Sequence, residues 1–155
     1  MKLNVVAVGK LKERFWKEAS AEYEKRLGAF ARLSIVEVPD RDPNRAGGEQ
    51  AAREAEGADI VKALGTSHAI LLAIDGTPRT SEQFSARLEE LMARGTSDIA
   101  FIVGGSTGVA DAVRARADET LSFGAITLPH NLARIVLLEQ LYRAFKIMRG
   151  EPYHK

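Results

Sequence analysis

The sequence predicts an α/β fold in which helices sandwich a mostly parallel sheet. Strand patterns and helix patterns alternate nearly throughout the 155 residues, as in proteins built from βαβ units. Two runs, AILLAID (69–75) and DIAFIVG (98–104), are almost continuously apolar, which is typical of strands covered on both faces. The length fits a single domain over residues 1–155, and no repeat, linker or low-complexity segment interrupts it.

The first half of the chain predicts strands separated by helices. LNVVAVG (3–9) is a β-branched run, and LSIVEVP (33–39) alternates until a proline stops it, so we expect a strand at each. Helical spacing of apolar residues predicts a helix over 13–27, and an Ala-rich charged segment predicts another over 49–64. A glycine follows each helix, and composition predicts a loop over 40–48.

Three further elements are expected between the two buried strands and the last helix. Thr80 and Gln83 have the spacing of a capping box, which predicts a helix over 81–93. A short helix is expected over 109–117. FGAITLP (123–129) predicts a strand or an extended stretch.

The last predicted helix, 131–148 with Asn131 as its N-cap, is apolar over too wide a band for a helix with one buried face. One side can pack on the sheet, and the other calls for a partner, most commonly a second copy related by a two-fold axis. Glu139, Arg143 and Lys146 share one stripe of the helix, although they could equally be surface charges.

Composition narrows the possible functions. The chain has no cysteine, which excludes a disulfide framework, a thiolate nucleophile and a Cys-based zinc site, and we expect no metal. The apolar run at the N-terminus is too short for a signal peptide or a membrane span, so we expect a cytoplasmic protein without membrane contact.

Positive charge is concentrated near the C-terminus, although the net charge is only +1. After His130, the acidic residues are Glu139 and Glu151, and the basic residues are Arg134, Arg143, Lys146, Arg149 and Lys155. Such an excess can attract phosphates, or it can be a solvated helix face followed by a charged tail.

The loop GGSTG (104–108) follows a buried strand, at the sheet edge where parallel sheets bind ligands. It has neither the lysine of a Walker loop nor the G-x-G-x-x-G spacing of a dinucleotide fingerprint. Glycines and small hydroxyl residues suit a flat base that bonds to bare backbone, but taken alone they are more simply explained by a structural turn. IDGTP (74–78) ends at the same edge, and its Asp75-Gly76 pair is most simply a turn.

Three segments of the sequence, taken together, resemble a known family: IVGGSTG, ITLPHNLARIVLLEQLYRAFKI and the terminal PYHK. This is the RlmH family, which comprises methyltransferases of the SPOUT superfamily that act on ribosomal RNA. LNVVAVGKLKE and IDGTP also fit, and the resemblance covers essentially the whole chain. It implies a C-terminal trefoil knot and a homodimer with the last helix at its interface. It also implies S-adenosylmethionine (SAM) as cofactor, bound in the knot. The implied reaction is methylation of N3 of a pseudouridine in helix 69 of 23S rRNA, preferably on assembled ribosomes.

The resemblance also implies site residues. The cofactor-binding residues are expected to be Leu72, Gly104, Gly105, Phe123, Gly124, Ala125, Ile126, Thr127 and Leu128. Ser106 and Thr107 vary among relatives and are not expected to make specific contacts.

The N3–H of pseudouridine is a weak acid, so the reaction needs a base or cationic donors that stabilise the anion. The catalytic candidates are His130, which could equally cap the last helix, together with Arg143, Tyr153 and His154. We hypothesise that residues 153–155 of one subunit reach the cofactor of the other, with Tyr153 stacking on a base. His68 precedes a buried strand and is interpreted as structural.

Three alternatives remain open on the sequence. The chain could be a non-catalytic ribosome-binding factor, which predicts no SAM affinity. It could be a SPOUT methyltransferase acting on tRNA, although the short chain leaves no room for an added RNA-binding domain. A nucleotide-phosphate enzyme is disfavoured by the missing phosphate motifs.

Overall fold

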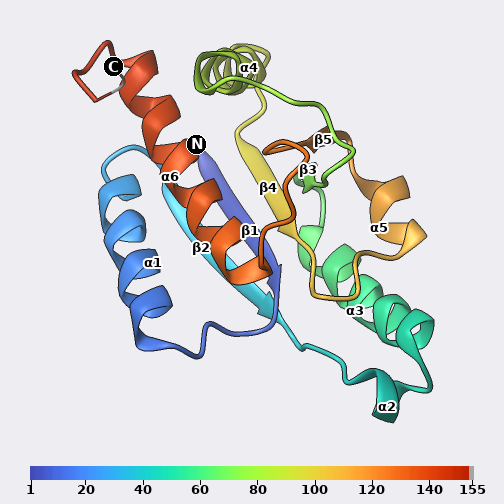
Figure 1. Ribbon diagram of the computed structural model, residues 1–155. Coiled ribbons are helices and arrows are strands. Elements are labelled where there is room, and N and C mark those ends of the chain that lie inside the picture. The colour runs from blue at the N-terminus through green and yellow to red at the C-terminus, as the bar shows by residue number, and fades with distance from the viewer. Residues whose placement is uncertain (154–155) are drawn as a thin grey trace.

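A five-stranded sheet with strand order β2-β1-β4-β3-β5 forms the centre of the computed structural model, and all of its pairings are parallel (Figure 1). The structure describes residues 1–153. The strands are β1 (Lys2–Val8), β2 (Arg32–Val38), β3 (His68–Leu72), β4 (Asp98–Val103) and β5 (Glu119–Leu121). The predicted α/β class and parallel sheet are therefore confirmed.

The two central strands, β1 and β4, are apolar on both sides because each side packs against helices. Val5 lies opposite Phe101 in the register, and Val6 lies opposite Ile102. Successive side chains of a strand point to opposite faces. Val5 and Phe101 accordingly belong to one buried cluster, while Val6 and Ile102 belong to the other. This two-sided burial explains the continuous apolar runs in the sequence.

Helices cover both faces of the sheet (Figure 1). One face carries α1 (Arg14–Leu27), α4 (Ser81–Ala93) and α6 (His130–Met148). The other carries α3 (Glu49–Leu64) and α5 (Asp111–Arg116), and the short helix α2 (Pro43–Ala46) contacts α3 without burying a residue. Within residues 1–153, no helix is both long enough and apolar enough to cross a membrane.

Local sequence signals placed most helix boundaries correctly. The capping box of α4 is present, since the Thr80 hydroxyl accepts from the Gln83 N–H at 3.1 Å and the Gln83 side chain accepts from the Thr80 N–H at 2.9 Å. The loop predicted over 40–48 instead contains the short helix α2, which Asp42 caps. Its proline in the first turn is compatible with a helix start.

Two predictions near the C-terminus are wrong. The last strand is β5, and residues 123–129 form an irregular loop. Gly124 has a φ of 107° in this loop, which breaks an extended run. The N-cap of α6 is Pro129 rather than Asn131, and no side chain caps this helix. Because Asn131 lies one residue inside the helix, its side chain is not placed to accept from the first-turn N–H groups.

Candidate functional site

The carboxyl ends of β3, β4 and β5 surround a pocket of about 810 Å³, called the central pocket below. Three chain segments that are distant in sequence form it: 72–75, 103–109 and 121–130. Arg114 on α5 and Ala133 on α6 complete the wall. Ligands of open parallel sheets bind at this edge, which agrees with the location expected from the loops.

Most of the predicted cofactor residues meet in the central pocket. Those that line it are Leu72, Gly104, Gly105, Phe123, Gly124, Ile126, Thr127 and Leu128. Ala125 is the exception, because it is exposed and does not line the cavity. Among the catalytic candidates, His130 lines the pocket at the first turn of α6.

The walls of the central pocket are mainly apolar side chains and bare backbone. Residues 126–128 adopt no regular structure, and within residues 1–153 their backbone N–H groups have no hydrogen-bond acceptor. The pocket also has a charged pair, in which Arg114 Nη1 lies 3.5 Å from Asp75 Oδ1. The pocket therefore offers apolar surface, open backbone donors and one ion pair at its rim.

Sequence reasoning missed this ion pair. Asp75 does lie in the expected turn, where the Gly76 N–H donates to the Ala73 carbonyl at 3.0 Å, but its side chain also lines the pocket. No motif or spacing in the sequence indicated that Arg114 would line the pocket. It reaches the site only because α5 packs beside α3 on one face of the sheet.

The paired glycines after β4 are required by protein packing. A Cβ on Gly104 would lie 2.7 Å from Cγ1 of Val109, and one on Gly105 would lie 2.9 Å from Cγ1 of Val8. Real Cβ atoms do not approach other carbons this closely, so any larger residue would displace the loop. At Gly104 and Gly105, the groups that lie very close to the backbone are therefore the protein's own side chains, Val109 and Val8.

Glu56 on α3 lies under the glycine loop with 3% of its surface exposed. Its Oε2 would be 3.3 Å from a Cβ on Gly105, and neither carboxylate oxygen has a hydrogen-bond partner among the described residues. The buried hydroxyl of Thr107 is likewise unpaired within residues 1–153. Burial, followed by the nearby charge of Asp40, raises the pKa of Glu56, and the backbone and charge of Arg41 together with the Thr107 hydroxyl offset part of this rise. A buried acid with a raised pKa thus supports the floor of the pocket.

Arg134 is not part of a basic surface. It is 2% exposed, and it donates to Glu37 Oε2 at 2.8 Å and to the Gly9 carbonyl at 2.9 Å. These bonds tie the start of α6 to the ends of β1 and β2. The arginine has a structural role because it is itself buried and bonds to groups of two neighbouring strand ends.

The other C-terminal cations are also paired. Arg143 pairs with Glu139 at 2.7 Å, Lys146 pairs with Glu151, and Arg149 lies 3.8 Å from the same glutamate. Lys155 lies outside the described residues. The predicted excess of basic charge at this end is therefore largely neutralised within the chain itself.

Arg143 and Tyr153 do not meet His130 in this chain. Tyr153 folds back onto α6, where its ring lies 4.9 Å from the Tyr142 ring and 4.7 Å from the Arg143 guanidinium. Its hydroxyl donates to Glu139 Oε1 at 3.2 Å. Burial, followed by the charge of Glu139, raises the pKa of Tyr153. At a rise of about 1.5 Å per residue, Arg143 lies roughly 20 Å along α6 from His130. His154 lies outside the described residues.

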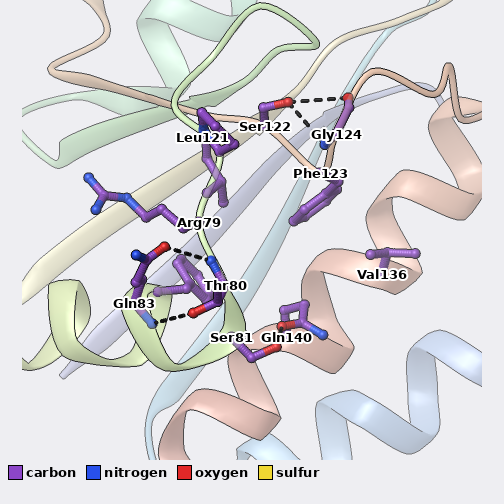
Figure 2. Close-up of a pocket in the computed structure, with 12 residues that line it drawn as sticks. Arg79, Thr80, Ser81, Gln83, Leu121, Ser122, Phe123, Gly124, Val136 and Gln140 are labelled. Atoms are coloured by element: carbon purple, nitrogen blue, oxygen red, sulfur yellow. Dashed lines mark hydrogen bonds between the residues drawn. The ribbon is translucent and has the colours of Figure 1, made fainter.

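Figure 2 shows a second cavity, of about 680 Å³, called the side pocket below. Leu121, Phe123 and Gly124 line both cavities and form the wall between them. Val136 and Gln140 of α6 close its other side. His68, by contrast, lies away from both cavities and bonds Glu119 through Nε2 at 2.7 Å, as its structural interpretation predicted.

Residues 1–154 match the family model described as "Predicted SPOUT methyltransferase". The chain belongs to this family. A full-length relative, the ribosomal RNA large subunit methyltransferase H of Listeria monocytogenes serotype 4a (strain HCC23), is 48% identical over 159 residues. The protein of the same name from Lactobacillus acidophilus (strain ATCC 700396 / NCK56 / N2 / NCFM) is 46% identical. In both comparisons the alignment covers 100% of each chain. The resemblance found in the sequence is therefore confirmed.

Solved structures support the fold of this SPOUT family member. A probable methyltransferase from Bordetella pertussis Tohama I aligns with a TM-score of 0.56 at 18% identity, covering 92% of this chain and 95% of that one. A putative methylase family protein from Neisseria gonorrhoeae aligns with a TM-score of 0.57 at 17% identity, covering 99% and 85%. At these identities the likeness concerns the fold alone.

Proposed function

We propose that this SPOUT family member is a SAM-dependent methyltransferase of large-subunit ribosomal RNA. The observation that carries the proposal is the full-length identity of 48% to a protein named ribosomal RNA large subunit methyltransferase H. The specific target we propose is N3 of a pseudouridine in helix 69 of 23S rRNA, on assembled ribosomes in the cytoplasm. The resemblance of the PYHK ending and the LPH…R…EQLYRA block supports this target.

The residues of the central pocket fit SAM. Its apolar walls suit an adenine ring, and the open N–H groups of 126–128 can bond to ring nitrogens. Arg114 and Asp75 at the rim can pair with the carboxylate and the ammonium of the methionine part. Among residues 1–153, no lysine lines the cavity, in keeping with a cofactor that has no phosphate.

When bound, SAM supplies an electrophilic methyl group on a sulfonium sulfur. The chain then has to align the acceptor nitrogen, exclude water and provide for the loss of the N3 proton. Leu72, Phe123 and Leu128 form walls that exclude water. His130 is the one histidine that the described residues place at the pocket, so it is a proton acceptor available within one chain.

The remaining candidates complete the site only from a second copy of the chain. Arg143 and Tyr153 lie far along α6 from their own pocket, so a two-fold partner would have to supply them together with His154. An apolar face of α6 supports this homodimer, because its residues belong to neither core cluster. The face consists of Leu132, Ile135, Val136 and Ile147. We further infer that the segment from β5 to α6 threads the implied trefoil knot.

Methyl transfer from labelled SAM to intact ribosomes, isolated large subunits and bulk tRNA tests the function. We expect label in a helix 69 pseudouridine, with intact ribosomes as the best acceptor. Label in tRNA would retain the enzyme class but overturn the substrate. If neither label nor SAM binding were detected, the alternative of a ribosome-docking domain would replace the proposal.

Deletion of residues 151–155 tests the contribution of the tail. We expect the truncated protein to lose methyl transfer while it retains most of its SAM affinity, measured by calorimetry. Mixing the truncated chain with a chain altered in the central pocket should restore part of the activity if the tail acts across the dimer. Full activity of the truncated chain alone would exclude a role for the tail.

A further inference from the structure

We propose that residues 10–17, which connect β1 to α1 and form the first turn of α1, are the docking surface for the RNA acceptor. The segment KLKERFWK is called the basic–aromatic segment below. The proposal rests on the proposed function, and it names the surface that holds RNA beside the central pocket. It places RNA contact at the opposite end of the chain from the basic C-terminus.

The charges of this segment are available to a partner. Lys10, Lys12 and Lys17 are exposed, and within residues 1–153 none of their side chains has an acidic partner. Arg14 pairs only with Glu18, at 2.6 Å, and that pair is open to solvent. Exposed cations of this kind release counterions when they contact phosphates, whereas the C-terminal cations are already paired.

Two aromatic rings lie among these cations. Phe15 is 59% exposed, and its ring centroid lies 4.8 Å from that of Trp16. Neither ring belongs to a core cluster, so packing of the protein interior does not account for these two aromatic residues. Unpaired bases stack on aromatic rings in single-stranded RNA and DNA complexes. Cations beside the exposed Phe15 ring and the partly exposed Trp16 ring are thus suited to RNA that presents unstacked bases, such as a hairpin loop.

The segment lies beside the site because β1 and β4 are neighbours in the sheet and end at the same edge (Figure 1). Val8 lies at the end of β1, and its Cγ1 would be 2.9 Å from a Cβ on Gly105, which lines the pocket. The next residue, Gly9, accepts a hydrogen bond from Arg134, which lies one turn beyond His130. RNA bound to residues 10–17 would therefore have a nucleotide within reach of the central pocket.

Charge reversal at Lys12 and Lys17 tests the proposal. Leu11, which is 7% exposed, anchors the loop and remains unchanged, so the fold should be retained. We expect Lys12→Glu/Lys17→Glu to weaken binding to ribosomes and to a helix 69 hairpin at least about tenfold. The slope of log affinity against log salt should fall by about one for each lysine removed. SAM affinity should stay within about twofold of the wild-type value, because neither lysine lines the pocket.

Lys25→Glu/Lys62→Glu is the matched control, since it makes the same charge change at two exposed lysines remote from the segment. Phe15→Ala should lower hairpin affinity with little change in the salt slope. Equal RNA affinity of the Lys12/Lys17 variant and the control would overturn the proposal. So would a loss of ribosome binding by Phe15→Ala without any loss of hairpin binding, because the partner of the rings would then be protein. Since binding is measured without methyl transfer, an inactive wild-type protein would refute the proposed function and leave this test standing.

Discussion

Gly104 and Gly105 show that small residues lining a pocket can be required by the protein interior. The loop passes so close to Val109 and Val8 that neither position has room for a Cβ. Gly108 differs, because it has a φ of 83° and open space around its Cβ position. One glycine of the loop thus meets a backbone requirement, and the other two meet a packing requirement.

Gly104→Ala should destabilise the protein by about 1–3 kcal/mol, since the added methyl group overpacks against Val109. Val109→Ala removes the opposing carbon, so the double variant should recover part of that loss. Urea denaturation of the four proteins in the cycle measures the coupling between the two sites. Additive effects would show that the clash with Val109 is not the cause.

Glu56→Gln should stabilise the protein at neutral pH by roughly 1 kcal/mol, because it removes a buried charge. The pKa of Glu56 is raised in the folded state, so its unfavourable contribution is absent below the unfolded pKa and grows as the pH rises through the folded pKa. Melting temperatures should therefore differ at pH 7 and converge near pH 4. Glu54→Gln, an exposed change on the same helix, is the control.

At the scale of elements, α6 has two faces with different roles. One face is apolar and is buried against the sheet and the neighbouring helices. It consists of Leu137, Leu138, Leu141, Ala144 and Phe145. The opposite face mixes apolar side chains with Glu139, Gln140, Arg143 and Lys146. The buried face fixes where His130 enters the pocket, and the outer face is available to a second chain.

Arg134→Met should destabilise the protein by about 1–3 kcal/mol, because it removes the hydrogen bonds that a buried guanidinium donates to Glu37 and to the Gly9 carbonyl. Arg94→Met removes an exposed i,i+4 pair with Glu90 and should cost less than about 1 kcal/mol. Chemical denaturation compares the two variants. Similar losses would mean that Arg134 acts as an ordinary surface residue.

At the scale of the molecule, one chain does not bring all the site candidates together. The central pocket lies at the carboxyl ends of the strands, whereas Tyr153 packs at the far end of α6. The proposed dimer would bring the central pocket of one chain close to Tyr153 of the other. The basic–aromatic segment would bind RNA near the end of β1.

Ile135→Glu should convert the proposed dimer to a monomer, because it places a charge on the outer apolar face of α6. Light scattering should give twice the chain mass for the wild-type protein and a single chain mass for the variant. Methyl transfer should fall together with the dimer. Met92→Glu, which adds a charge at another exposed apolar residue, should leave both properties unchanged.

Local patterns in the sequence determined the α/β class and the limits of α3 and α4, because these depend on periodicity and caps. The pocket positions 72, 104–105, 123–124 and 126–128 were implied by the family resemblance rather than by local pattern. Tertiary structure decided what depends on distant partners. β5 is a short strand with two polar residues that is defined by its pairing to β3. Arg134 is buried because Glu37 and Gly9 meet it, and Arg114 lines the pocket because α5 packs on α3. Charge counted along the chain cannot distinguish a paired cation from a free one, so the available basic surface emerged only from the fold.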